Sequence, residues 1–379
     1  MLGYIVAALI ASAAGGVGAA DAAAPVVSVQ EDGVGEADRT ARLLAGMRDD
    51  VPTRDWRTRG YTKRLASAFE HFEAKVGTPM QAWAERAVVQ SAGDTVFYPF
   101  AGADFPTAHR LYPKASRYVL VAMQRGGPLP RPDVLDREER ELLLAEYEGL
   151  LTGFLRRGFF KTQEMNDGTS GQATVRGITG LLMAFAVREG FAIRSIEPIQ
   201  LDDTGAVVVH TGDRARGATW DSVRMQLTRR SDGAPVVLEY LRVGLSNMNV
   251  KPGTPAHAFI AGLADDRVIL KAASHLPQDL NFSHFTDLVL AQAPTIVQDE
   301  TGVAYDELTH RFAVELYGSY AQVNLLFDDE DQNTLIEAYR SAKTVPRLPF
   351  HVGYRKGTQA CMLVATRPAG APGAPPTGP

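Results

Sequence analysis

Residues 94–124 read DTVFYPFAGADFPTAHRLYPKASRYVLVAMQ, and this stretch decides the fold. Residues 95–98 are a short β-prone run without helical periodicity, which is typical of a strand buried on both faces. Pro99 cannot donate a hydrogen bond to a neighbouring strand, so the strand should end there. Residues 118–123 form a second continuous apolar run. The stretch therefore predicts two neighbouring parallel strands joined by a short helix.

The connection between these strands has the features of a tight loop followed by a helix. Gly102 lies between two alanines, and this lack of bulk lets the backbone turn sharply and lets a ligand approach its amides. Asp104 occupies the N-cap position and Pro106 the first turn of a helix over 105–112, which Pro113 ends. In nucleotide-binding folds such a loop holds an anion, and an acid at the tip of the second strand holds the ribose. The tip here is Met123-Gln124, so we favour a packing loop, with a cofactor site as the alternative.

The apolar patterns of the remaining chain predict alternating helices and strands. Residues 231–233 are a turn signal, and the strands around them indicate an antiparallel section that leads back to the central sheet. We expect helices at 36–47, 65–72, 79–90, 134–154, 180–187, 254–263, 282–296 and 332–341, and strands at 192–201, 206–210, 220–228, 236–245 and 267–272. A terminal hairpin is expected from 350–354 and 360–366.

The order of these elements is similar to that of a class I methyltransferase. We therefore expect an α/β fold with a Rossmann-like, mostly parallel sheet, an antiparallel insertion, a closing C-terminal hairpin and an N-terminal helical extension. The expected parts are a signal peptide at 1–23, a linker at 24–35, a helical segment at 36–92, the α/β domain at 93–367 and a Pro/Gly-rich tail at 368–379.

The N-terminal segment and the composition bear on location and partners. Residues 3–20 are apolar and rich in Ala and Gly, and small residues follow, which is typical of a secretory signal peptide. Export to the periplasm is therefore expected, with a retained membrane anchor as the alternative. A net charge of −5 gives no attraction to nucleic acid. Cys361 is the single cysteine, so an intramolecular disulfide is excluded and a small core residue is the simplest role.

Few residue patterns point to chemistry. The eight histidines form no metal-binding spacing, and no metal or cofactor is expected. The string Gly168-Thr169-Ser170-Gly171 lacks the spacing of a serine nucleophile and is assigned to a loop. The basic residues of 54–64 are interpreted as a solvated helix face, with an anion site as the alternative.

One edge of the predicted sheet is the candidate ligand cleft. Carboxyl ends of parallel strands bind ligands in open α/β proteins, and His109 and His275 both follow strands that end there. Asp299 and Glu300 stand in a turn with Gly302, where a structural turn is favoured over an acid–base pair. The complete candidate set is Tyr98, Phe100, Gly102, Asp104, His109, His275, Asp299, Glu300 and Tyr305.

The sequence resembles a family of uncharacterised exported bacterial proteins. The family has a Y-P-F-x-G-x-D segment near its start, matched at residues 98–104, and a Q-D-[DE]-[ST]-G-[VI]-x-Y segment near its end, matched at 298–305. Further matching pieces are RYVLVAM, LEYLRVGLSN, LKAASHLPQDLNFSHF, YGSYAQVNLLF and FHVGYRKGTQACMLVA. The resemblance brings no activity with it, and many relatives carry Glu where this chain has Gln124.

Three functions follow from these features. The first is a non-catalytic scaffold that binds a small-molecule ligand or a cell-envelope partner. The second is a methyltransferase-like or envelope-modifying enzyme that uses the cleft at Gly102 and Asp104. The third is an interaction protein tethered to the membrane by its uncleaved leader.

Overall fold

The first two strands lie side by side, as the sequence predicts. In the computed structural model, β1 (Thr95–Pro99) pairs in parallel with β2 (Arg117–Ala122). Between them runs α4 (Phe105–Leu111), whose N-cap Asp104 accepts a hydrogen bond from the Thr107 amide at 3.1 Å. The parallel pairing and the intervening helix confirm the predicted β-α-β unit. The unit was predictable because local sequence signals specify each of its parts.

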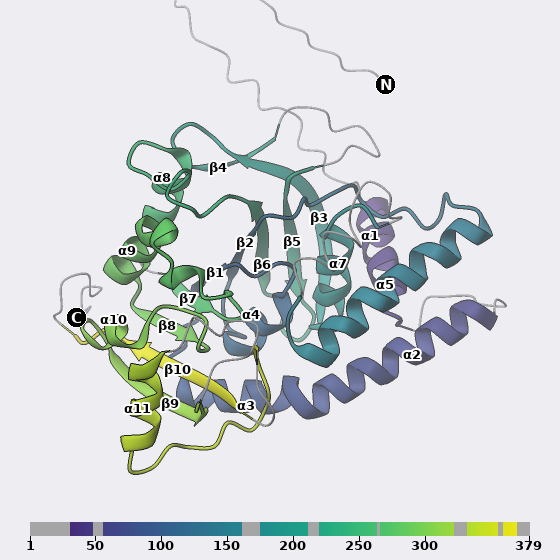
Figure 1. Cartoon of the computed structure of the whole chain (residues 1–379). Coiled ribbons are helices and arrows are strands. Elements are labelled where there is room, and N and C mark those ends of the chain that lie inside the picture. Colours follow the sequence, from purple (N-terminus) through teal and green to yellow (C-terminus); the bar gives the residue numbers. More distant parts are fainter. Residues whose placement is uncertain are drawn as a thin grey trace, which may run out of the picture.

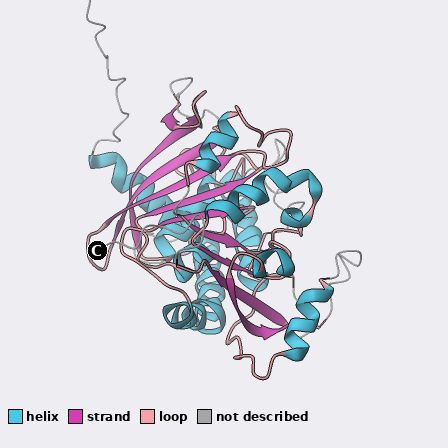
Figure 2. Cartoon of the chain, turned by 90° about the vertical axis from the view of Figure 1, so that its left-hand side faces the viewer, coloured by secondary structure: helices cyan, strands magenta, loops and turns pink. Residues whose placement is uncertain are grey.

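A single ten-stranded sheet continues from this unit (Figure 2). Its order is β4-β3-β5-β6-β2-β1-β7-β8-β10-β9. The middle strands β6, β2, β1, β7 and β8 are parallel, whereas the pairings on both flanks are antiparallel. The remaining strands are β3 (Phe191–Leu201), β4 (Val207–Val209), β5 (Ser222–Arg229), β6 (Pro235–Arg242), β7 (Arg267–Leu270), β8 (Thr295–Gln298), β9 (Ala313–Ser319) and β10 (Ala360–Thr366).

Helices cover both faces of the sheet, so the chain forms three layers (Figure 1). One apolar core packs Val96, Tyr98 and Leu120 against the N-terminal helices. The second core packs Phe97 and Val119 against the C-terminal helices. The first layer comprises α1 (Glu31–Leu44), α2 (Trp56–Phe72), the π-helix Glu73–Gly77, α3 (Thr78–Ala87), α4, α5 (Arg137–Arg157) and α7 (Thr179–Arg188); the second comprises α8 (Pro255–Ala261), α9 (Ser283–Gln292), α10 (Tyr305–Thr309) and α11 (Asn333–Ser341).

Local chemistry explains the longest helix. Asp136 and Glu139 form a capping box at the start of α5, and Gly158 ends the helix in the left-handed region at φ 79°. The basic face of α2 lies beside α5, where Arg57 and Arg64 contact Glu141 and Glu148. These arginines of the predicted solvated face therefore serve exposed ion pairs between two helices.

Three expectations about elements are wrong. The helix expected over 282–296 ends at Gln292, and residues 295–298 form the buried strand β8. Residues 350–354 form no strand, so the expected hairpin between 350–354 and 360–366 does not form. Instead, β10 pairs antiparallel with β8 and with β9. The first helix begins at Glu31, inside the expected linker.

The structure describes residues 31–47, 56–160, 175–210, 220–263, 266–321, 332–354 and 359–369. The expected signal peptide, residues 370–379 of the expected tail and the Gly168–Gly171 string lie outside these residues. Within the described ranges, no helix has the length and apolar character needed to cross a membrane.

Candidate functional site

The carboxyl edge of β1 and β7 gathers most of the predicted site residues. The two strands are neighbours, and the chain leaves β1 toward α4 and leaves β7 toward residues 271–275. Open α/β sheets bind ligands at such an edge, where connections on either side diverge. We define the carboxyl edge here as the residues that follow these two strands and β8.

A buried ion pair occupies the centre of this edge. The Nζ atom of Lys271 lies 2.6 Å from Oδ2 of Asp104, and each residue is only 1% exposed. Tyr98 donates its hydroxyl to the same Oδ2 at 2.9 Å, while Lys271 also donates to Thr107 Oγ1 at 3.0 Å and to the carbonyl of Gly158. The pair therefore connects β1, α4, β7 and the end of α5 through one network.

Burial dominates the electrostatics of this network. It raises the pKa of the Asp104 carboxyl, and the Lys271 charge and two hydrogen bonds from Thr107 oppose that shift. It also raises the pKa of Tyr98 far above its usual value, so the phenol remains a hydrogen-bond donor. An unpaired charge would be costly here, and each ionic group accordingly has a partner.

Asp299, directly after β8, connects the end of this strand to the segment after β7 through hydrogen bonds. Its carboxylate accepts the Ala272 amide at 2.8 Å and the Thr301 hydroxyl at 2.6 Å. Thr301 Oγ1 in turn accepts the Ala273 amide at 2.7 Å. Burial raises the pKa of Asp299, and these hydrogen bonds oppose the shift. The favoured interpretation of Asp299 as a turn residue agrees with these contacts.

Backbone strain is concentrated at the same edge. Among the described residues, the non-glycine residues with positive φ are Phe100 (61°), Ala272 (51°), Ser274 (55°) and His275 (58°). Phe100 directly follows β1, and the other three lie within five residues after the end of β7. Such conformations cost about 1 kcal/mol or more each and commonly mark functional edges.

Glu300 and Tyr305 face the second core. The Cys361 thiol donates to Glu300 Oε2 at 3.2 Å, and burial together with Asp299 raises the pKa of Glu300 to about 8. Burial also raises the pKa of Cys361 well above its usual value, as befits a core thiol. The Tyr305 amide donates to Gln332, which donates to the Glu300 carbonyl.

His109 lies away from the carboxyl edge. Its Nδ1 contacts Glu189 at 2.7 Å, and its ring packs against Phe191 at the start of β3. Phe100 does lie at the edge, with its ring 5.4 Å from that of Phe285, and Gly102 is buried with φ 58°. His275, in the segment after β7, is 3% exposed.

Lys271 is the site residue that sequence reasoning missed. It stands at the end of the apolar run Val268–Leu270, inside an expected strand. A lysine is almost never fully buried without an anionic partner. That rule could have indicated a buried acid nearby, although not that the acid is Asp104.

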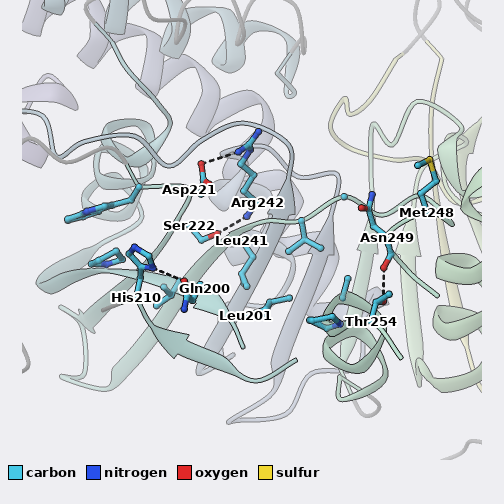
Figure 3. Close-up of a pocket in the computed structure, with 17 residues that line it drawn as sticks. Gln200, Leu201, His210, Asp221, Ser222, Leu241, Arg242, Met248, Asn249 and Thr254 are labelled. Atoms are coloured by element: carbon cyan, nitrogen blue, oxygen red, sulfur yellow. Dashed lines mark hydrogen bonds and ion pairs between the residues drawn. The ribbon is translucent and has the colours of Figure 1, made fainter. Parts of the chain in front are cut away.

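An open cavity lies elsewhere, beside the antiparallel flank of the sheet (Figure 3). This β3–β6 pocket has a volume of about 660 Å³. Polar contacts ring it: His210 Nδ1 to Gln200 Oε1 at 2.6 Å, Arg242 to Asp221 at 3.0 Å, the Arg242 amide to Ser222 Oγ at 3.0 Å and Thr254 to the Asn249 carbonyl at 2.6 Å. Apolar and small residues complete its lining: Pro198, Ile199, Leu201, Trp220, Ser222, Leu241, Val243, Gly244, Met248, Pro255 and Ala256.

Metal-ligand geometry and comparisons with known proteins were the two remaining sources of evidence about a functional site. The described part of the chain brings no three His, Cys, Asp or Glu residues together in a way that could hold a metal ion. No family model, curated protein or solved structure matches this chain.

Proposed function

We propose that this chain is an exported, non-catalytic α/β protein that binds a ligand or a cell-envelope partner on a Rossmann-like, methyltransferase-like sheet. The strand order supports the fold assignment. Numbered along the chain, the parallel strands β1, β2, β6, β7 and β8 lie in the order 3-2-1-4-5, which is the start of the nucleotide-binding arrangement. The antiparallel β10 between β8 and β9 corresponds to the closing strand expected of the methyltransferase type.

One observation carries the non-catalytic proposal: the chain's own side chains fill the edge where a cofactor would bind. The loop 101–103 is buried, and the next residue, Asp104, forms an ion pair with Lys271. A dinucleotide or S-adenosylmethionine needs accessible loop amides and an acid at the end of the second strand. At that position the chain has Gln124, which is buried. Its backbone carbonyl accepts a hydrogen bond from the Tyr240 hydroxyl at 2.6 Å.

Calorimetric titration and thermal unfolding test this proposal with S-adenosylmethionine, NAD and ATP at millimolar concentration. A ligand that binds only the native state must raise stability by RT ln(1 + [L]/Kd). We expect no heat of binding and no rise in Tm for any of the three. Methyl transfer to an envelope substrate, or clear stabilisation by one of these ligands, would contradict the proposal.

The strained edge supports a second candidate, a methyltransferase-like or envelope-modifying enzyme that works at Gly102 and Asp104. Positive φ at Phe100, Ala272, Ser274 and His275 has to be held by surrounding structure, and such strain is common at active sites. The same titrations separate the two candidates. An enzyme of this type would bind S-adenosylmethionine, and Gly102→Val would weaken that binding.

Export is proposed from the apolar segment at residues 3–20. Mass spectrometry of the chain isolated from its natural cell would read the mature N-terminus. Cleavage near residue 23 supports export, while an intact Met1 would favour the membrane-tethered interaction protein.

A further inference from the structure

We infer that the β3–β6 pocket binds a mainly apolar small molecule that carries one negative charge. This inference goes beyond the proposed function, because it assigns a site and a ligand chemistry where the proposal names only a scaffold. The pocket lies where the antiparallel flank meets the carboxyl end of β6, and none of the residues that follow β1, β7 or β8 lines it.

The size of the cavity suits a small molecule. Its volume of about 660 Å³ falls within the range of roughly 300–1,000 Å³ that is usual for ligand sites. Strands β3, β5 and β6 form one side, and residues 243–256 form the other (Figure 3). Regular strands therefore hold much of the wall in place, as a preformed site requires.

The inner wall is apolar. Ile199 and Leu241 are buried in the second core and also line the pocket. Leu201 and Val243 pack against the same core and continue this surface toward the rim. A polar ligand would lose hydration against these side chains without recovering hydrogen bonds, whereas an apolar body gains roughly 25 cal/mol for each Å² removed from water.

The described charged residues at and beside the rim carry one net positive charge. Asp221 and Arg242 line the pocket and lie 3.0 Å apart, and Arg125, which lies outside the lining, is 3.2 Å from the same carboxylate oxygen. Two guanidinium groups and one carboxylate sum to +1. A single anionic group on the ligand would balance this charge, whereas a nucleotide with several phosphates would meet too few cations.

Arg242 is also held in position for such a contact. Its Nε donates to the Met123 carbonyl at 3.0 Å and its Nη1 donates to Asp221. No hydrogen bond within the described ranges uses its Nη2, and its side chain is 35% exposed. The guanidinium therefore presents a fixed donor at the rim, which is the geometry that favours a carboxylate or sulfonate.

Trp220 adds a second feature suited to such a ligand. Its indole ring lines the pocket and is half-buried, and its N–H has no partner among the described residues. A flat apolar ligand can pack on the ring, and an acceptor on that ligand would satisfy the buried donor.

A matched pair of fluorescent probes tests the inference on the purified chain. The first probe, 8-anilinonaphthalene-1-sulfonate, has an apolar ring system and one sulfonate. The second, N-phenyl-1-naphthylamine, has the same rings without the charge. We expect one site for each, with the sulfonate probe bound about five- to tenfold more tightly, since a tenfold change is what about one charge-assisted contact supplies.

Four variants locate the site. Val243→Trp, directly after β6, and Ala256→Phe, on α8, fill the pocket, and each should weaken both probes at least tenfold. Arg242→Gln should remove the preference for the sulfonate probe and the salt dependence of its Kd. The matched control Arg194→Gln changes an exposed arginine on β3 that contacts Thr228 and does not line the pocket, so it should leave both Kd values unchanged.

Several results would overturn the inference. These are absence of sulfonate-probe binding to the natural sequence, unchanged binding in a filled variant that unfolds cooperatively, or an Arg242→Gln variant that keeps the full sulfonate preference. If both filled variants fail to fold, Arg242→Gln decides, because its side chain is partly exposed and its loss leaves the fold intact. Failure of this inference would leave the non-catalytic proposal standing, since that proposal depends on the residues that follow β1, β7 and β8, and none of these lines the pocket.

Discussion

Replacing Lys271 by Met tests the role assigned to the carboxyl edge. The substitution keeps the length and most of the apolar volume of the side chain and removes the ammonium group with its charge and its hydrogen-bond donors. Asp104 then loses the cation 2.6 Å away, and Thr107 and the Gly158 carbonyl each lose a hydrogen-bond partner. Asp104 remains fully buried, so water cannot replace the missing ammonium.

The expected cost follows from that burial. Removing one partner of a buried ion pair costs about 3–5 kcal/mol, because the other charge is left without compensation. At roughly 2 °C for each kcal/mol in a chain of this size, Tm should fall by about 6–10 °C. The matched control Lys114→Met changes an exposed lysine and should cost less than about 0.5 kcal/mol.

Urea unfolding of Lys271→Met, Asp104→Asn and the double variant measures the coupling between the two residues. Asn keeps the N-cap of α4, so the double variant has no buried charge and should be more stable than the sum of the single losses predicts, by about 2 kcal/mol. The deficit of Lys271→Met should also shrink toward pH 5. Burial raises the pKa of Asp104 in the folded state, so the native state retains a proton that the unfolded state loses as pH rises.

Additive losses in this cycle would refute the reasoning, as would a loss below about 1 kcal/mol for Lys271→Met at pH 7. Either result would mean that the two side chains are solvated or separated in solution. The edge would then be open, and the argument against cofactor binding would fail with it.

Two further predictions concern the turn after β8. The folded-state pKa of Glu300 is raised to about 8, so the native state holds a proton between about pH 4.5 and 8 and stability falls as pH rises through that window. Glu300→Gln should remove a slope of up to ~1.4 kcal/mol per pH unit in urea unfolding, and parallel curves for both chains would count against it. Gly353→Ala should cost about 2–3 kcal/mol, because φ is 63° and the new Cβ would lie 2.2 Å from Asp299 Oδ2. Gly93→Ala, at φ 86° with nothing within 4 Å, should cost only about 1 kcal/mol, and equal losses would show that the contact with Asp299 does not matter.

The parts of the fold that sequence reasoning predicted are those with strong local signals. The β1–α4–β2 unit is an example, since two apolar runs, Pro99 and the N-cap Asp104 specify it within about thirty residues. The α5 helix is another, and its apolar spacing was sufficient to predict it. Neither needed knowledge of distant partners.

The failures arise where local patterns are ambiguous or pairing is distant. Residues 295–298 continue the apolar character of α9, and a short apolar run cannot by itself be assigned to a helix or a strand. Pro294, directly before β8, was the signal that the helix had ended. The partners of β10 are β8 and β9, with α11 between β9 and β10 in the chain, so neighbouring sequence suggested a hairpin that does not form.

The candidate site shows the same division. Asp104 was predicted as a helix cap, and its side chain does accept the Thr107 amide. Its ionic partner Lys271 directly follows β7, much later in the chain, and nothing local to Asp104 indicates it. His109 follows β1 in sequence, yet its position on α4 turns it toward Glu189. The β3–β6 pocket likewise forms only where three strands and a loop meet, so no single stretch of sequence predicts it.

A crystal structure of the chain grown with millimolar S-adenosylmethionine would test the central claim most directly. If the chain's own side chains fill this edge, the loop around Gly102 will keep its buried position, Lys271 will still contact Asp104, and no ligand will lie against them. A bound molecule seated on the Gly102 amides, with the Lys271–Asp104 contact broken to admit it, would contradict the account.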